Sequence, residues 1–228
     1  MSANPAIPKL PPVAPQMRGA ITGVSGTGKG NCAKAWIARE IAAKRAPRVV
    51  VFDPDDEYSK LGHARPGHVH LGPLTHRVTA DAFLSDVGRW LDHKFVSLAV
   101  VPSDDDDEAS EQCFEFCKEV KATGDLLVVF DEIGGYAFDA ENPRPAQRGL
   151  KLIATKARKD NVSALFVAQR AMQIPKTARG QINALETFAQ FDDDDLKQLA
   201  KWTGDRSLIE RAPKLPRGQS LAWVSPML

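Results

Sequence analysis

The feature that most constrains this chain is a glycine-rich stretch at residues 21–31, which reads Ile-Thr-Gly-Val-Ser-Gly-Thr-Gly-Lys-Gly-Asn. Gly23, Gly28 and Lys29 fit the spacing G-x-x-x-x-G-K, in which closely spaced glycines let backbone N–H groups converge on an anion at the start of a helix. A short apolar segment precedes the stretch, and the residues after it place apolar side chains on one helical face, at Ala33, Ile37 and Ile41. The sequence therefore predicts a strand, a phosphate-binding loop and a helix. A glycine-rich turn without a ligand is the alternative, but it would leave Lys29 unexplained.

The residues expected to hold a nucleotide are those of the loop and the first helical turn: Gly23, Val24, Ser25, Gly26, Thr27, Gly28, Lys29, Gly30 and Asn31. Lys29 is expected to meet the β- and γ-phosphates. The motif normally continues with Ser or Thr, whose hydroxyl binds Mg²⁺, but this chain has Gly30 there. We therefore expect Mg²⁺ to be held through water, through a side chain such as Asn31, or by acidic residues further along the chain.

Length and composition favour one α/β domain. The chain has 228 residues, 43% of them hydrophobic, and a net charge of +1, so any contact with nucleic acid needs a local basic surface. We predict a Pro-rich arm at residues 1–17, a domain at 18–205 that contains the phosphate-binding loop, and a basic tail at 206–228 that includes a short edge strand. The arm is expected to be disordered or to lie across a neighbouring subunit. The sequence shows no membrane-spanning run and no signal peptide, which favours a soluble intracellular protein.

The cysteines and histidines give little support to a metal site. Cys32, Cys113 and Cys117 lack the spacing of a disulfide framework or a zinc site, and the last two share a helical face that suits core packing. Three histidines lie in a Gly- and Pro-rich context, where metal binding is the weaker interpretation: His63, His68 and His70.

The order of apolar runs predicts a mainly parallel sheet flanked by helices. Strands are expected at residues 18–24, 49–52, 95–101, 125–133, 163–168 and 187–191, and helices at 29–44, 81–92, after 108 and at 150–159. Residues 60–80 are expected to form a surface excursion, and 141–147 a loop. Asp53 follows the second strand and is either a site residue or a capping residue. The acidic runs at 104–108 and 192–195 are expected to cap helices, with metal binding as the alternative.

A second chemical anchor follows the apolar run at 125–133, which ends in Asp131 and Glu132. An acid at such a strand end can hold Mg²⁺ through water, and an adjacent glutamate can orient and deprotonate the water that attacks a γ-phosphate. The strand at 163–168 ends in Gln169, whose amide is placed to sense that phosphate or to position water. The densest basic stretch precedes that strand, on the helix expected at 150–159, and consists of Lys151, Lys156, Arg158 and Lys159.

With these residues in place, the chain resembles the FtsK/HerA superfamily of P-loop motor ATPases. Within it, the chain is similar to the small genome-packaging ATPases of viruses with an internal membrane. The resemblance rests on residues 23–29, 51–58, 126–132, 157–170 and 188–196, and it covers most of the chain between 18 and 200. It implies a RecA-like (ASCE-type) core with the acidic strand between the loop strand and the other strands. It also implies ATP and Mg²⁺ as ligands.

By the same resemblance, Lys29 binds phosphates, Asp131 holds the metal, Glu132 is the catalytic base and Gln169 is the polar sensor. Arg158 matches an arginine that reaches the nucleotide of a neighbouring subunit, although a solvated charge or a DNA contact explains it equally well. The resemblance further implies a homo-oligomeric ring around double-stranded DNA, with six subunits favoured over five, and a capsid-vertex or membrane protein as a partner. The expected location is the host cytoplasm, with association with the virion.

Several functions fit these patterns. The leading function is ATP-driven packaging of double-stranded DNA into a viral capsid. The DNA is expected to be bound without sequence preference. The alternatives are a DNA-transfer or phage-morphogenesis ATPase with another cargo, a nucleotide-binding assembly protein with little hydrolysis, and a small-molecule kinase. DNA-stimulated ATPase activity separates the motors from the last two.

Overall fold

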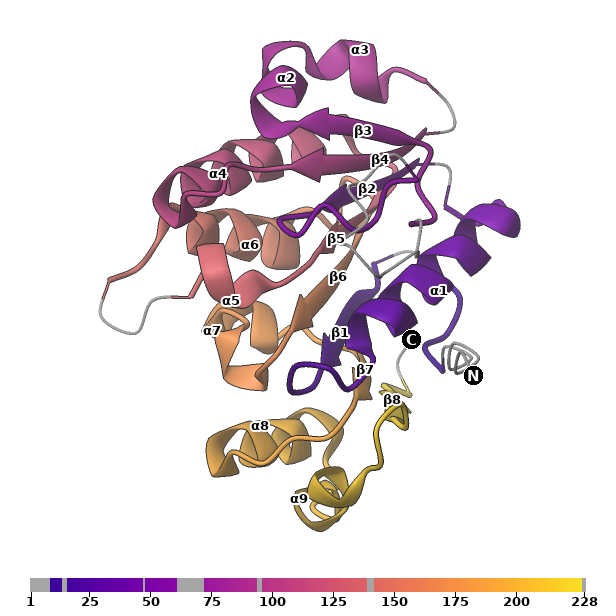
Figure 1. The fold of residues 1–228 in the computed structure, drawn as a ribbon, viewed down its shortest axis with the longest axis vertical. Helices are drawn as coiled ribbons and strands as arrows, with labels where there is room; N and C mark the ends of the chain where they lie inside the picture. The colour runs from indigo at the N-terminus through magenta and orange to yellow at the C-terminus, as the bar shows by residue number, and fades with distance from the viewer. Residues whose placement is uncertain are drawn as a thin grey trace.

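A computed structural model of the chain describes residues 9–13, 16–46, 48–60, 72–93, 96–138 and 142–226. In these residues eight strands form one sheet in the order β3-β4-β2-β5-β6-β1-β7-β8 (Figure 1). Their bounds are β1 Arg18–Thr22, β2 Arg48–Phe52, β3 His76–Thr79, β4 Val96–Val101, β5 Leu126–Phe130, β6 Val162–Ala168, β7 Ala184–Thr187 and β8 Leu221–Val224. All neighbouring strands are parallel except β8, which runs antiparallel to β7. The mainly parallel sheet expected from the sequence is confirmed.

Helices cover both faces of the sheet (Figure 1). They are α1 Lys29–Ala42, α2 Ala80–Ser85, α3 Val87–Leu91, α4 Asp106–Thr123, α5 Ile133–Tyr136, α6 Pro145–Lys156, α7 Lys176–Arg179, α8 Asp193–Thr203 and α9 Leu208–Arg211, with short 3₁₀ turns η1 Ala171–Gln173 and η2 Ala212–Lys214. In β2, Val49 and Val51 join the core beneath α1, whereas Val50 and Phe52 join the core beneath α4 and α6. Since alternate residues enter different cores, both sides of the strand must be apolar, which explains its continuous hydrophobic run.

Close packing of α4 against α6 fixes the larger core. A Cβ atom on Gly149 would lie 3.0 Å from the Cys117 sulfur and 3.1 Å from the Phe114 Cα atom, so the two helices approach more closely than a larger residue would allow. Cys113 and Cys117 are both buried free cysteines on this face of α4. Their expected role in core packing is confirmed.

The acidic runs cap helices. Asp105 accepts hydrogen bonds from the N–H groups of Asp107 and Glu108 at the start of α4, and Asp192 accepts them from Asp194 and Asp195 at the start of α8. These bonds satisfy N–H groups that have no partner within the helix. The described residues contain no cluster of three or more metal-ligating side chains. The three histidines considered above lie outside the described residues.

Several boundaries differ from the sequence-based expectation. Helix α6 begins at Pro145, inside the segment expected to be a loop, because proline suits the first helical turn, where no N–H is required. The expected helix at 81–92 is divided at Asp86, which caps α3. Strand β3 falls within the expected surface excursion, and residues 61–71 of that excursion lie outside the described part. The last parallel strand is β7 and ends at Thr187, because the apolar residues that follow it turn beneath the phosphate-binding loop instead.

The described part of the N-terminal arm lies on the chain's own surface. Leu10 is buried in the core beneath α1, and the carbonyl of Pro11 accepts a hydrogen bond from the Trp36 indole. For residues 9–13 this placement differs from both alternatives expected for the arm, whereas residues 1–8, 14 and 15 lie outside the described part. The placement of residues 9–13 is explained by contacts with α1 and β7 that no local sequence pattern reveals.

Candidate nucleotide-binding site

The glycine-rich loop joins β1 to α1 in the conformation that a phosphate-binding loop requires. Gly26 and Gly28 have φ angles of 75° and 112°, which side-chain-bearing residues rarely adopt, and Gly28 is the N-cap of α1. A Cβ atom on Gly23 would lie 2.6 Å from that of Phe188, so the loop also packs tightly against the segment after β7. The expected nucleotide-binding residues thus surround the N-terminus of α1, where free N–H groups and the helix dipole favour an anion.

Three of the expected catalytic side chains meet beside this loop. The Lys29 Nζ atom lies 2.9 Å from Glu132 Oε1, and the Gln169 amide donates a hydrogen bond of 3.2 Å to Glu132 Oε2. Lys29 is 7% exposed and Glu132 26% exposed. In this arrangement the lysine that would bind phosphate neutralises the glutamate that would act as the base.

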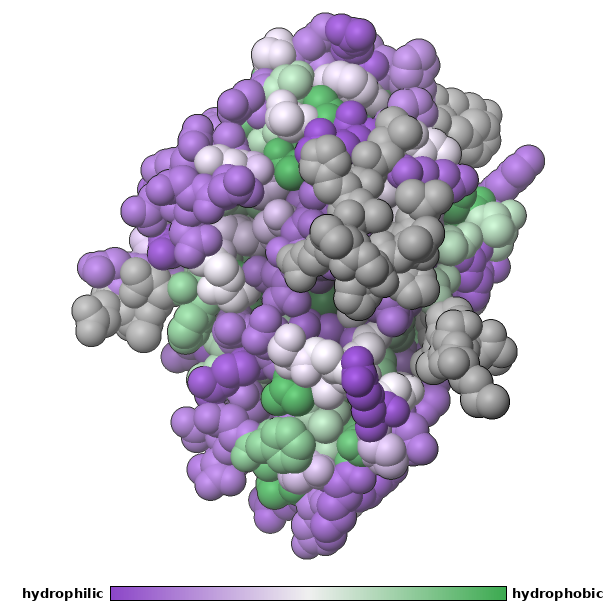
Figure 2. All heavy atoms as spheres, in the orientation of Figure 1, coloured by the Kyte–Doolittle hydropathy of each residue, from purple (hydrophilic) through white to green (hydrophobic). Residues whose placement is uncertain are grey.

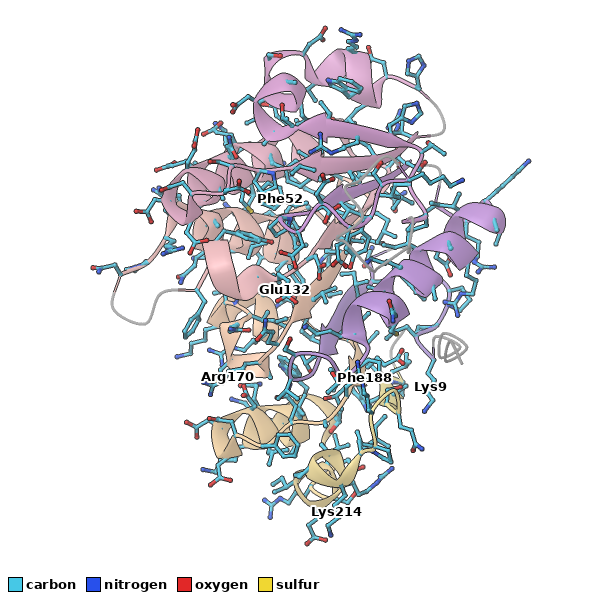
Figure 3. All side chains as sticks on the ribbon, in the orientation of Figure 1. Lys9, Phe52, Glu132, Arg170, Phe188 and Lys214 are labelled. Atoms are coloured by element: carbon cyan, nitrogen blue, oxygen red, sulfur yellow. The ribbon has the colours of Figure 1, made fainter. Side chains whose placement is uncertain are left out.

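Glu132 has an unusual backbone conformation. Its φ and ψ angles are 40° and 48°, in the left-handed region, where it forms the N-cap of α5. Such a conformation costs about 1–3 kcal/mol in a residue other than glycine, and it persists only when the surrounding structure enforces it. Here it turns the chain out of β5, so that the side chain after Asp131 reaches Lys29 and Gln169. Figure 3 labels Glu132 near the middle of the view.

Asp131 is the best placed of the described residues to hold a divalent cation. Its Oδ1 atom is buried without a hydrogen-bond partner in the described part of the chain. Burial, and then the negative charges of Glu132 and Asp53, raises the pKa of Asp131 to about 7. A buried oxygen with an unused lone pair, among like charges, suits a cation or its bound water.

Asp53 combines the two roles considered for it. Its carboxylate accepts the N–H groups of Glu57 at 3.0 Å and Tyr58 at 2.8 Å, which makes it the cap of the turn after β2. Its charge also contributes to the raised pKa of Asp131, and burial raises its own pKa to about 6. Asp53 therefore shapes the acidic side of the site while it holds a turn.

A cleft of about 450 Å³ opens beside these residues. Its lining comes from the loop after β1 and from the segments after β2, β4, β5 and β6: Ser25, Pro54, Asp55, Ser103, Asp104, Asp106, Ala109, Glu132, Gly134, Gly135, Tyr136, Gln169 and Gln173. Because the carboxyl ends of parallel strands meet at one edge of the sheet, five separate segments can contribute to one cleft.

The position after the lysine has room for a larger side chain. A Cβ atom on Gly30 would meet no atom within 4 Å, so steric exclusion does not explain the missing hydroxyl. Asn31 is exposed on the first turn of α1. The residues that fit Mg²⁺ are therefore the acids after β5, rather than a hydroxyl of the loop.

Arg158 lies at the other end of the sheet. It follows α6 and precedes β6, whereas Gln169 follows β6, so the strand separates Arg158 from the nucleotide loop of its own chain. Its Nε atom is buried without a partner among the described residues. Burial, and then the charge of Arg158, lowers the pKa of the buried Arg18 to about 10.

The chain matches one family model, described as the central domain of the helicase HerA, over residues 15–207. No curated protein matches it. Among solved structures, the genome-packaging NTPase B204 of Sulfolobus turreted icosahedral virus 2, in complex with ATP-gammaS, has a TM-score of 0.64 at 14% identity, over 94% of this chain and 95% of that one. VirB4 of Thermoanaerobacter pseudethanolicus has a TM-score of 0.57 at 10% identity, over 91% and 87%. The pCW3 conjugation coupling protein TcpA has a TM-score of 0.56 at 12% identity, over 94% of this chain and 59% of that one.

The similar structures indicate the fold class, and the family model indicates the family. The fold is that of a RecA-like P-loop NTPase, in which β6 lies between the loop strand β1 and the acidic strand β5. This order corrects the expectation that the acidic strand would adjoin the loop strand. The chain belongs to the FtsK/HerA-type family that the HerA central domain defines.

Sequence reasoning missed part of the site. The Gly218 N–H donates to the Thr27 carbonyl at 3.0 Å, so the C-terminal tail borders the loop. Val24 donates to the carbonyl of Ala189 at 3.1 Å, in the segment that follows β7. Neither contact has a local sequence signal, apart from the resemblance noted over residues 188–196.

The raised pKa of Asp131 predicts how stability depends on pH. Because the folded-state value of about 7 exceeds the ordinary value of 3.8, the folded chain binds more protons between these limits, and its stability should fall as pH rises from 4 to 7. Asp131→Asn removes this titration. Between pH 4 and pH 7 the unfolding free energy of the nucleotide-free parent should therefore fall by on the order of 1–3 kcal/mol more than that of the variant. Urea denaturation at each pH measures this difference.

Asp193→Asn, at an exposed position, controls for the change in net charge. Parallel stability curves for the parent and Asp131→Asn from pH 4 to 7 would show that Asp131 is not buried among like charges.

Proposed function

We propose that this chain is the ATPase of a motor that translocates double-stranded DNA into a viral capsid. The observation that carries the proposal is the meeting of Lys29, Glu132 and Gln169 beside a phosphate-binding loop. Family membership supports an NTPase, and the cargo is inferred from similar solved structures, such as the genome-packaging NTPase.

The reaction requires little beyond what these residues supply. When ATP enters, the phosphates compete with Glu132 for Lys29, so the ion pair opens and the carboxylate becomes free to accept a proton. Water oriented by Glu132 attacks the γ-phosphorus, the bond to the ADP oxygen breaks, and the proton passes to Glu132. Gln169 remains within hydrogen-bonding distance of Glu132 and positions that carboxylate or the water.

Mg²⁺ fits the donor set, with Asp131 as the residue that would hold it, directly or through water. The ion would supply neutralisation of the charge on the phosphate oxygens. Asp131 would change at the same time from a carboxyl group with a raised pKa to an ionised ligand, because a nearby cation favours the charged form.

Structural similarity supports packaging over conjugation, because the packaging NTPase in complex with ATP-gammaS has a TM-score of 0.64, against 0.56 for the conjugation coupling protein and 0.57 for VirB4. DNA transfer remains the second candidate, because VirB4 is similar over 87% of its length. The described residues contain no helix long and apolar enough to cross a membrane.

Substitutions of Lys29 and Glu132 should affect different steps, namely nucleotide binding and turnover. Lys29→Ala should abolish nucleotide binding, because it removes the phosphate ligand. Glu132→Gln should lower turnover by about 10²–10⁴-fold, the usual contribution of a general base. It should leave nucleotide affinity equal to or tighter than that of the parent, since the variant also releases Lys29. Phosphate release and fluorescent-nucleotide titration measure the two effects.

Glu111→Gln, an exposed substitution on α4, is the control and should behave as the parent. Hydrolysis by Glu132→Gln at the parent rate would mean that another group is the base.

DNA should bind through a local basic surface without sequence preference. Three basic residues near the loop after the acidic strand are the candidates: Arg144, Arg148 and Lys151. Arg144 already has partners, because it donates to the Gly135 carbonyl at 2.6 Å and lies 3.6 Å from Asp106. Arg148 stacks over Phe114, and Lys151 is exposed on α6. Lys151 is thus the least constrained of the three.

Double-stranded DNA should stimulate ATP hydrolysis, and its affinity should fall steeply with salt, because phosphate contacts release counterions. Lys151→Ala should weaken binding similarly for unrelated sequences and reduce the salt slope by about one unit per lost contact. Fluorescence anisotropy at several salt concentrations measures both. Equal affinity at low and high salt would exclude this mode of binding.

We infer a ring of subunits, with six favoured over five, which would bring Arg158 to a neighbour's nucleotide.

Exposed apolar side chains lie near α8 and α9. Figure 2 shows hydrophobic side chains on the viewed face toward the end where Figure 1 places these helices. Phe191, beside α8, is 63% exposed, and Ile209 of α9 is 38% exposed. Exposed apolar groups of this kind support contact with another protein, such as a second subunit or a capsid-vertex or membrane protein.

An arginine supplied by a neighbour can raise turnover by about 10³–10⁵-fold. Arg158→Ala and Glu132→Gln should each be inactive alone, yet mixed rings should recover partial ATPase activity, because some interfaces join an intact Arg158 to an intact Glu132. No recovery in rings shown to be mixed, or full activity of Arg158→Ala alone, would remove Arg158 from the mechanism.

A further inference from the structure

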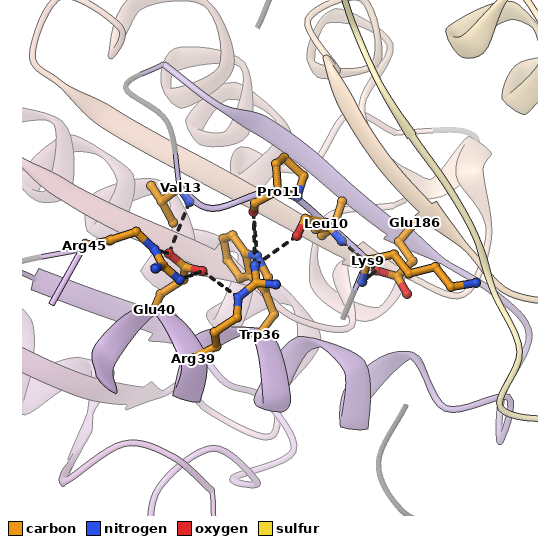
Figure 4. Close-up of polar contacts among 9 residues, drawn as sticks. All are labelled: Lys9, Leu10, Pro11, Val13, Trp36, Arg39, Glu40, Arg45 and Glu186. Atoms are coloured by element: carbon orange, nitrogen blue, oxygen red, sulfur yellow. Dashed lines mark hydrogen bonds and ion pairs between the residues drawn. The ribbon is translucent and has the colours of Figure 1, made fainter. Parts of the chain in front are cut away.

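The described part of the N-terminal arm is held by a buried carboxylate of β7. The backbone N–H groups of Lys9 and Leu10 donate to Glu186 Oε2 at 3.1 Å and 3.3 Å (Figure 4). Glu186 is fully buried, and Leu10 is 1% exposed. A buried carboxylate needs hydrogen-bond donors, because leaving it without partners carries the full cost of desolvation. The arm therefore supplies donors that Glu186 requires.

The same carboxylate holds the C-terminal tail and borders α1. Ser220 donates a hydrogen bond of 2.7 Å to the other oxygen, Glu186 Oε1, and the Lys9 ammonium donates to the Ser220 carbonyl at 2.5 Å. Burial, and then the charge of Glu186, raises the pKa of the Cys32 thiol in the first turn of α1. Glu186 thus lies where the arm, the tail and the nucleotide-loop helix converge.

The tail passes from this point to the nucleotide loop. Gly218, two residues before Ser220, donates its N–H to the Thr27 carbonyl at 3.0 Å, and it has a φ angle of 79°. The Thr27 hydroxyl in turn donates to the Val24 carbonyl at 2.8 Å across the loop. A short series of hydrogen bonds therefore connects Glu186 to the backbone of the loop that is expected to hold the phosphates.

We propose that Glu186 is a positioning residue for nucleotide binding, which acts by holding Ser220 so that Gly218 braces the loop at Thr27. The seated arm reinforces this brace through the contact of Lys9 with the Ser220 carbonyl. The inference rests on the proposed nucleotide-binding function. It assigns Glu186 to the affinity for nucleotide and leaves the chemical step to Glu132.

The arm has a second anchor that offers a matched control. The Val13 N–H donates to Glu40 Oε2 at 3.2 Å, and Arg39 and Arg45 pair with the same carboxylate (Figure 4). Glu40 holds the arm on α1, but the hydrogen bonds that it makes do not include the tail. Weakening Glu40 therefore loosens the arm while Glu186 keeps its bond to Ser220.

The test compares Ser220→Ala, Lys9→Met and Glu40→Gln in the full chain, with ATP-gammaS as the binding probe. Ser220→Ala should raise the dissociation constant and the KM for ATP about three- to tenfold, and change kcat less than twofold. Such a change corresponds to losing part of one hydrogen bond to a charged group. Lys9→Met, at an exposed position where folding is not threatened, should shift binding less in the same direction. Glu40→Gln should leave binding within twofold of the parent.

Amide exchange at Gly218 gives a second readout that does not depend on nucleotide. It should become faster in Ser220→Ala and stay unchanged in Glu40→Gln. Parent-like binding and exchange in both Ser220→Ala and Lys9→Met would overturn the inference. So would an equal loss of affinity in Glu40→Gln, which would point to general loosening of the arm. If the parent itself binds no ATP-gammaS, the proposed function fails, while exchange at Gly218 still decides whether Glu186 braces the loop.

Discussion

The order of the strands is the constraint on which the site depends. Because β6 lies between β1 and β5, the loop after β1 and the acids after β5 stand two strand spacings apart, roughly 10 Å. Long side chains must cross that distance. Lys29 and Glu132 do so and meet at 2.9 Å, with Gln169 of the intervening strand beside them. The cleft described above opens beside this meeting point, with Ser25, Glu132 and Gln169 in its lining.

Much of this could be predicted from the sequence, because it is encoded locally. The loop spacing, the apolar runs and the acids after β5 each depend on neighbouring residues, and the caps at Asp105 and Asp192 follow from short-range hydrogen bonds. The missed features depend on distant partners. β7 ends at Thr187 because the next residues pack under the loop, and the arm docks because Glu186 needs donors. No local pattern records such requirements.

Charge is divided between the two ends of the sheet. At the carboxyl ends, Asp131 and Asp53 are buried acids with raised pKa values. At the amino ends, the Arg18 guanidinium is buried and donates to the backbone carbonyls of Ile153, Ala154 and Val162. Each end therefore holds charge that is only partly compensated within the chain. At the acidic end, a nearby cation would favour the charged form of these carboxylates.

The shared carboxylate of Glu186 also bears on how the protein is made. Lys9 and Ser220, which meet beside it, are separated by 211 positions in the sequence. At synthesis rates of about 5–20 residues per second, the arm leaves the ribosome roughly 10–40 s before the tail that completes its binding place. During that interval the buried acid lacks one of its donors and the phosphate loop lacks its brace. The phosphate loop therefore gains its brace only after the tail has been synthesised, so a nascent chain that still lacks the tail should bind ATP more weakly than the finished one.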